Sequence, residues 1–168
     1  MKLYYFNLYG RAEATRMALT KAGVAFEDKR ITGEDFTKLK AENPDFAEFG
    51  QLPVLEKDGK FYSQSTAILR MVCIENGFYP KDPVDSWKVE SMNDSFTDMM
   101  NPLFGIFFNP ALSDEEKGAK VVEMLKAKFP TLLGKVEARL KANSSQKHLV
   151  GDSWTIVDRK SVVEGKSV

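Results

Sequence analysis

The first half of the chain combines short apolar runs with apolar residues at helical spacing. Residues 3–6 form an apolar and aromatic run that is typical of a buried strand. Apolar residues then recur at helical spacing over residues 14–22, which predicts a helix. Residues 24–31 suit a second strand, whereas the more polar stretch 32–50 is assigned neither a strand nor a helix.

Two further apolar segments, 54–56 and 60–62, flank the turn sequence Lys57-Asp58-Gly59, which predicts a β-hairpin. A helix is expected over residues 65–76, with Gly77 directly after its end. The element order is then β-α-β followed by β-β-α. This order predicts one mixed α/β sheet with helices packed on it.

The second half of the chain has a helical pattern, and the division falls near residue 80. Apolar residues from Val89 to Leu103 are spaced three and four positions apart, which predicts one buried helical stripe. Pro102 is expected to kink or end that helix. Ser113 and Glu116 form a capping box that begins another helix. The expected core face of this helix holds Val122, Leu125, Phe129, Leu132, Val136 and Leu140.

Composition narrows the class of protein. Lysine plus arginine and aspartate plus glutamate number 24 each, so no net charge favours nucleic acid or an anionic membrane. Cys73 is the only cysteine, which excludes an internal disulfide and a cysteine-based metal cluster, and we expect it to be a buried, inert thiol. The sequence has no apolar run long enough for a membrane span and no signal peptide. We therefore expect a reduced, cytoplasmic protein without a metal site.

Tyr5 is the first candidate for chemistry. It closes the first predicted strand, and Gly10-Arg11 opens the first predicted helix. Ligands often bind where a strand end faces a helix N-terminus. Taken alone, Tyr5 is more simply explained as a half-buried aromatic residue of the strand.

Three other features are ambiguous in the same way. Pro53 stands after Leu52 at the start of an apolar strand, where it marks a sheet edge, a plain loop or a cis bond. Ser65 is a natural N-cap, and free N–H groups at that helix end also suit a carboxylate ligand. Asp94 and Asp98 lie four positions apart, which is typical of a solvated helix face.

Four segments in chain order share features with one known family. They are Lys2-Leu3-Tyr4-Tyr5-Phe6-Asn7 with Gly10-Arg11-Ala12-Glu13, Phe49-Gly50-Gln51-Leu52-Pro53-Val54-Leu55, Gln64-Ser65-Thr66-Ala67-Ile68, and Gly151-Asp152-Ser153 with Thr155-Ile156-Val157-Asp158. Together they resemble the cytosolic glutathione transferases of the sigma class over residues 2–158. The resemblance implies an α/β thioredoxin-like N-terminal domain over residues 1–79 and an all-α C-terminal domain over residues 84–168.

The resemblance also implies a role for Tyr5 and Arg11. Tyr5 would be the catalytic residue that donates a hydrogen bond to the glutathione sulfur, and Arg11 would keep the sulfur site electropositive. A free thiol with a pKa of about 8.5 is mostly protonated at neutral pH, while the thiolate is the nucleophile. A donor at the sulfur therefore favours the reactive form.

The remaining site residues follow from the same match. The implied glutathione-binding residues are Tyr5, Arg11, Phe36, Lys40, Gln51, Leu52, Pro53, Gln64, Ser65 and Asp98. Leu52 would pair its backbone with the cysteinyl part, Gln64 and Ser65 would hold the γ-glutamyl end, and Lys40 the glycine carboxylate. Asp98 would reach the site of a partner subunit, which implies a homodimer. Phe36 and Gln51 stand where many relatives carry tryptophan and lysine. The implied electrophile pocket is Leu8, Tyr9, Met99, Leu103 and Phe104, all of which could equally be core residues.

The implied function is conjugation of glutathione, as co-substrate, to small hydrophobic electrophiles in detoxification. Two alternatives stay open: a glutathione-dependent isomerase of the prostaglandin D synthase type, and a catalytically weak glutathione-binding or structural relative. The resemblance ends at Asp158, and residues 159–168 read as foreign or frame-shifted sequence, with a natural short form as the alternative. Within them, Lys160-Ser161-Val162 recurs as Lys166-Ser167-Val168. We therefore expect a truncated helical domain with an aberrant, loosely ordered tail.

Overall fold

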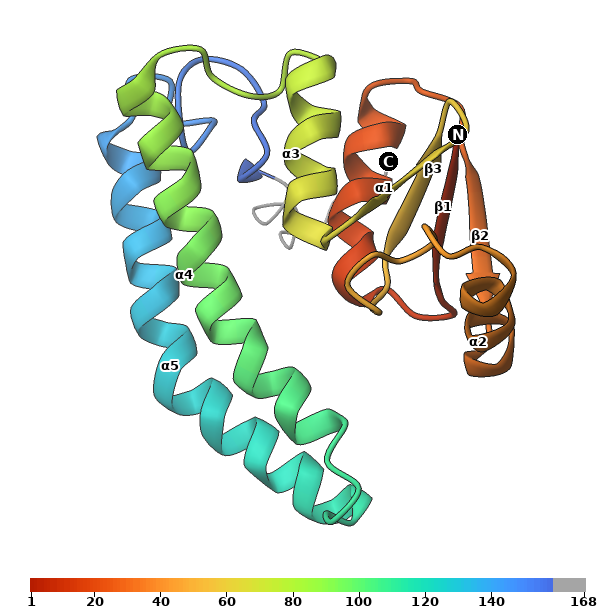
Figure 1. Cartoon of the computed structure of the whole chain (residues 1–168). Coiled ribbons are helices and arrows are strands. Elements are labelled where there is room, and N and C mark those ends of the chain that lie inside the picture. The colour runs from red at the N-terminus through yellow and green to blue at the C-terminus, as the bar shows by residue number, and fades with distance from the viewer. Residues whose placement is uncertain (159–168) are drawn as a thin grey trace. The chain divides into compact units, whose positions relative to one another are not determined.

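The structure is a computed structural model, and it describes residues 1–158 (Figure 1). It divides into two compact units, the first covering Met1–Tyr79 and the second beginning at Pro80. The elements of the first unit are β1 (Lys2–Phe6), the 3-10 turn η1 (Gly10–Ala12), α1 (Glu13–Lys21), β2 (Glu27–Ile31), α2 (Gly33–Glu42), β3 (Val54–Lys57), β4 (Lys60–Ser63) and α3 (Ser65–Glu75). The second unit contains α4 (Pro83–Phe107) and α5 (Asp114–Ala142).

The first unit is built on a four-stranded sheet in the order β2-β1-β3-β4. β1 pairs with β2 in parallel and with β3 antiparallel, so the predicted mixed α/β sheet is confirmed. Because β1 is central and covered on both faces, Leu3, Tyr4 and Tyr5 are all buried. α1 and α3 pack against each other, and α3 also contacts β3 and β4.

α2 is a helix that the sequence pattern missed in the stretch 32–50. It begins with a capping box, in which Thr32 Oγ1 accepts from the Asp35 N–H at 3.1 Å and Asp35 accepts from the Thr32 N–H at 2.9 Å. Phe36 and Leu39 are its apolar contacts with the core cluster around Phe46. This helix depends on a local cap and on two apolar residues. Its apolar stripe is too short to be recognised from the spacing of apolar residues alone.

The helical pattern of the second half is confirmed, but its details differ from expectation. α4 runs through Pro102 and ends at Phe107. Val89, Met92 and Met99 from its predicted stripe are buried. α5 begins with the predicted capping box of Ser113 and Glu116. In Figure 1, α4 and α5 run antiparallel beside each other.

The expected core face of α5 is wrong at two positions. The side chains of Val122 and Phe129 are 50% and 37% exposed, and α5 has no fully buried residue. α5 packs along one neighbour, α4, so the part of its apolar stripe that turns away from α4 stays accessible in the described structure.

The segment after α5 is held by one buried carboxylate. Asp158, which is 3% exposed, accepts from the N–H groups of Leu149 at 2.8 Å and Thr155 at 2.7 Å. It also accepts from Thr155 Oγ1 at 3.1 Å. The expected loosely ordered tail, residues 159–168, lies outside the described residues.

Two side chains of β1 meet one carboxylate of β3. Tyr4 Oη donates to Glu56 Oε2 at 2.6 Å, and Lys2 Nζ lies 3.0 Å from Glu56 Oε1. The Tyr4 hydroxyl, and next the Lys2 ammonium, lower the pKa of Glu56 below its usual value. Burial, reinforced by the Glu56 carboxylate, raises the pKa of Tyr4.

Glu56→Gln is expected to lower the free energy of unfolding by about 1–3 kcal/mol at neutral pH, because the charged acceptor is lost. A carboxyl whose pKa is lowered in the folded state stabilises it above the unfolded pKa of about 4.3 and ceases to do so as the pH falls through the folded pKa. Urea denaturation should therefore show a difference between wild type and variant that shrinks on acidification. The control is Glu27→Gln, which removes an exposed pair with Lys29 and should cost little. A Glu56→Gln difference that stays constant with pH would contradict this account.

Candidate functional site

The hydroxyl of Tyr5 is the centre of the candidate site. Tyr5 lies near the carboxyl end of β1 and is 5% exposed. Its Oη accepts a hydrogen bond from the backbone N–H of Arg11 at 3.0 Å. Because this N–H occupies one lone pair of the oxygen, the hydroxyl proton remains for a second acceptor. Tyr5 is therefore more than a buried strand aromatic, since its polar end has a specific partner.

Gly10 lets the backbone come this close to Tyr5. Its φ is +42°, and a Cβ built there would lie 2.6 Å from Tyr5 Oη and 2.5 Å from Leu8 Cδ1. No side chain fits in that space, and the left-handed conformation also favours glycine.

The register of the sheet brings three predicted segments to the same end of its strands, which we call the sheet edge. Tyr4 pairs with Val54 on β3, and Val54 pairs with Ser63 on β4. Tyr5 follows Tyr4, Leu52-Pro53 precedes Val54, and Gln64-Ser65 follows Ser63. Segments that are about 60 residues apart in the chain therefore lie along a single edge of the sheet.

The Leu52–Pro53 peptide bond is cis, which is one of the three alternatives that the sequence left open. Pro53 is buried, Leu52 is half-buried and Gln51 is exposed.

The N-terminus of α3 differs from expectation in its cap. Gln64, with φ +74°, is the N-cap residue, and Ser65 is the first residue of the helix. Gln64 makes no side-chain capping hydrogen bond, and the first turn of α3 carries no acidic residue. This helix end therefore has neither a side-chain cap nor a negative charge of its own, which suits a carboxylate ligand.

Phe36 and Lys40 are neighbours on α2. Lys40 Nζ lies 4.5 Å from the centroid of the Phe36 ring, which is a cation–π contact. The Phe36 ring also packs edge-on against Phe6, the residue after Tyr5, with 6.3 Å between centroids. The ring thus connects α2 with the end of β1.

The second unit holds the other predicted residues. Asp98 is exposed, Met99 is buried, and Leu103 and Phe104 are partly buried. The Phe104 ring stacks on Phe108 with 6.2 Å between centroids.

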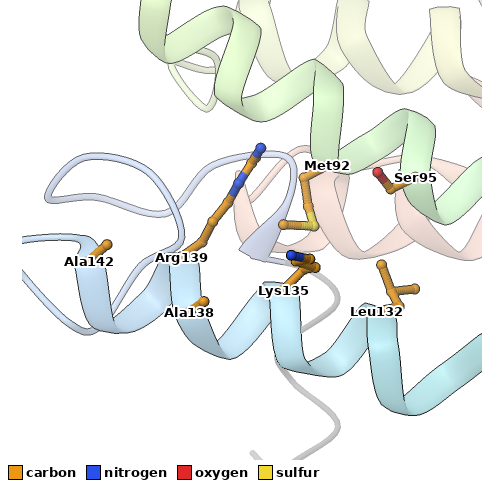
Figure 2. Close-up of a pocket in the computed structure, with 7 residues that line it drawn as sticks. All are labelled: Met92, Ser95, Leu132, Lys135, Ala138, Arg139 and Ala142. Atoms are coloured by element: carbon orange, nitrogen blue, oxygen red, sulfur yellow. The ribbon is translucent and has the colours of Figure 1, made fainter.

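Two hollows lie along α4 and α5. Figure 2 shows the first, of about 450 Å³, where Met92 and Ser95 of α4 face Leu132, Lys135 and Arg139 of α5. The second, of about 420 Å³, is lined by residues that include Asp98 and Met99.

Arg16 was not singled out from the sequence, although it lies beside Tyr5. Its guanidinium carbon is 5.8 Å from the centroid of the Tyr5 ring, and the residue is 7% exposed. The available signal was a charged residue within the apolar spacing of residues 14–22.

Residues 1–158 contain no group of three His, Cys, Asp or Glu side chains placed to hold a metal ion. Cys73 is buried in α3, as expected. None of the helices described is long and apolar enough to cross a membrane.

The fold and the site define a class: a thioredoxin-like α/β domain with a tyrosine at one sheet edge, followed by an all-helical domain. Family models for the glutathione S-transferase N-terminal and C-terminal domains match residues 1–72 and 99–162. The chain therefore belongs to the glutathione S-transferase family.

Individual relatives agree with this assignment. Glutathione S-transferase 1 of Ascaris suum is 37% identical, over 94% of this chain and 74% of its own length. The hematopoietic prostaglandin D synthase of Gallus gallus is 34% identical, over 94% and 73%. The crystal structure of a monomeric glutathione S-transferase from the hookworm Necator americanus matches with a TM-score of 0.77 and 34% identity, over 94% and 75%.

These matches do not support the expected truncation of the helical domain. The C-terminal family model matches through residue 162, beyond Asp158, where the resemblance was expected to end.

Gly10→Ala is expected to displace the Arg11 N–H from the Tyr5 hydroxyl, because the new methyl group would overlap Tyr5 and Leu8. It should lower the free energy of unfolding by more than the roughly 1–2 kcal/mol of a left-handed alanine. Glutathione conjugation at neutral pH should fall with it.

Gly23→Ala is the matched control, because Gly23 has φ +67° and nothing within 4 Å of the added Cβ. This variant should show only the conformational cost and keep full activity. Denaturation and turnover, measured on both variants, separate the two effects. Equal losses in the two variants would show that the contact with Tyr5 is unimportant.

Proposed function

We propose that this protein conjugates the thiolate of glutathione to small hydrophobic electrophiles, with Tyr5 as the catalytic residue. The observation that carries the proposal is the Arg11 N–H held 3.0 Å from Tyr5 Oη at the sheet edge. It fixes the hydroxyl oxygen and leaves the proton to be donated to a sulfur placed at this edge. Stabilising the thiolate by one unit of thiol pKa corresponds to about 1.4 kcal/mol.

The other groups at the edge suit the parts of glutathione. The N-terminus of α3, with Gln64 and Ser65, would bind the γ-glutamyl carboxylate. The backbone of Leu52 would pair with the cysteinyl part, beside Gln51 and Pro53. Lys40, next to Phe36, would attract the glycine carboxylate, and the Arg11 side chain would add positive charge at the sulfur.

The electrophile would bind where apolar surface is accessible beside Tyr5. Leu8 and Tyr9, in the loop after β1, are 37% and 75% exposed. The other predicted residues of the electrophile pocket belong to the helical half; they are Met99, Leu103 and Phe104.

We further propose that the protein acts in the cytoplasm as a homodimer. Asp98 motivates the dimer, because its carboxylate is exposed and the family resemblance implies that it reaches the glutathione site of a partner subunit. The hookworm relative described as monomeric shows that an individual member can differ.

The proposal as a whole is tested by retention on immobilised glutathione, followed by a chromogenic conjugation assay. Retention with turnover is expected. Retention without turnover would indicate the binding or structural alternative instead.

Tyr5→Phe tests the catalytic role by removing one hydroxyl and little else. Turnover at neutral pH should fall on the order of 10-fold or more, as expected for loss of one donor to a developing anion. Glutathione affinity and the unfolding midpoint should change slightly. If turnover is unaffected, another residue activates the thiol.

Asp98→Asn tests the dimer. It should weaken glutathione binding, and dilution of the wild-type protein should weaken binding in parallel with dissociation. Asp94→Asn is the control, because Asp94 is exposed on the same helix one turn away. A protein that sediments as a monomer and binds glutathione fully would remove Asp98 from the site.

Isomerisation is the second candidate, favoured by the 34% identity to the prostaglandin D synthase. Both reactions need the same thiolate, so Tyr5→Phe should impair both. Assaying the wild-type protein with a prostaglandin endoperoxide and with a chromogenic electrophile distinguishes the two substrates.

A further inference from the structure

We propose that Arg16 is a positioning residue for thiol activation: its buried guanidinium fixes the loop that holds the Arg11 N–H against Tyr5. This inference rests on the proposed function of Tyr5. It concerns how the hydroxyl is held in place and adds no contact between Arg16 and glutathione.

The guanidinium of Arg16 connects three segments of the first unit. Nη1 donates to Glu13 Oε2 at 2.9 Å and to the carbonyl oxygens of Tyr9 at 3.2 Å and Leu8 at 3.3 Å. Nε donates to Asp28 Oδ1 at 3.0 Å. Helix α1, strand β2 and the loop after β1 therefore meet at one planar, charged group, which only arginine can supply with this fork of donors.

Because the guanidinium is buried, losing any of these contacts is energetically costly. The Arg16 side chain is 8% exposed, and a charge removed from water is costly unless it is paired and hydrogen-bonded. Nη2 is buried without a hydrogen-bond partner among the described residues. The hydrogen bonds that offset the burial of this charge are therefore those of Nη1 and Nε. The two loop carbonyls cannot move away without leaving part of this charge unsatisfied.

A second arginine holds the same loop from β2. Arg30 pairs with Asp28 Oδ2 at 2.7 Å and donates to the Leu8 carbonyl at 2.9 Å. Asp28 thus bridges the two arginines, and both arginines donate to one carbonyl oxygen. Glu13, Arg16, Asp28 and Arg30 form one network with equal numbers of positive and negative charges.

The restrained carbonyls lie directly before the functional contact. Leu8 and Tyr9 precede Gly10, which has no side chain to hold it, and Gly10 precedes the Arg11 N–H that reaches Tyr5 Oη. A shift of about 1 Å in this loop would lengthen the 3.0 Å contact beyond hydrogen-bonding distance. The hydroxyl would then lose its fixed orientation, although Tyr5 itself stays buried in β1.

The test compares four variants by the pH dependence of kcat/KM and by thiolate absorbance of bound glutathione. Arg16→Met should lower kcat/KM at neutral pH about 10-fold and move the pH profile about one unit to the alkaline side. Arg16→Lys keeps the charge without the planar set of guanidinium donors, so its effects on kcat/KM and on the pH profile should be intermediate. KM for glutathione should change little, because Leu52, Gln64 and Ser65 belong to other segments.

Arg30→Met keeps the test informative if the Arg16 variants fold poorly, because the Arg30 side chain is 32% exposed and Arg16 stays paired. It should shift the profile in the same direction by a smaller amount. Lys29→Met, which removes an exposed pair on the same strand, should shift nothing. Lower stability with unchanged pH profiles in the Arg16 and Arg30 variants would overturn the inference.

Hydrogen exchange of the Arg11 amide, followed by NMR without glutathione, separates this inference from the proposed function. Exchange should be slow in wild type and Lys29→Met and faster in Arg30→Met and Arg16→Met. If wild type binds no thiolate but the exchange depends on Arg16, the proposed function is wrong and the positioning role stands. If wild type is active and the exchange is independent of both arginines, the positioning role is wrong.

Discussion

The hydrogen bond from the Arg11 N–H to Tyr5 Oη, 3.0 Å long, depends on constraints from much of the first unit. β1 must be central for the ring to be buried, and Gly10 must lack a side chain for the backbone to approach. The loop between them must also keep one conformation, which the buried charge of Arg16 enforces through two carbonyls. Tyr5 is 5% exposed, and a polar group in such a setting is costly to leave without a hydrogen-bond partner.

The same sheet also brings the distant segments of the proposed site together. β3 and β4 pair so that the cis Leu52–Pro53 bond and the Gln64-Ser65 helix start lie at the edge where Tyr5 lies. Each segment offers a different chemistry: a hydroxyl donor, strand backbone and an uncapped helix N-terminus. The N-terminal family model covers all three segments.

The second unit follows simpler rules. α4 and α5 are amphipathic helices that pack along each other, and both begin with a side-chain cap, Asp82 for α4 and Ser113 for α5. Their contact leaves hollows of about 450 and 420 Å³ that are lined by both apolar and charged residues. The exposed Val122 and Phe129 show that one helical neighbour covers only part of an apolar stripe.

The sequence by itself determined the features that local chemistry encodes. The aromatic run of β1, the Lys57-Asp58-Gly59 turn, the stripe of α4 and the Ser113 cap each depend on residues a few positions apart, and each was predicted. Motif order also indicated the family and its site segments. The sequence did not predict α2, the N-cap position of Gln64 or the buried contacts of Arg16, and its prediction for the core face of α5 was wrong at two positions. Burial and the pairing of Arg16 with Asp28 depend on segments that meet only in the folded chain. Tertiary structure decided these features, because the cost of a buried charge and the covering of a helix face are set by neighbours in space.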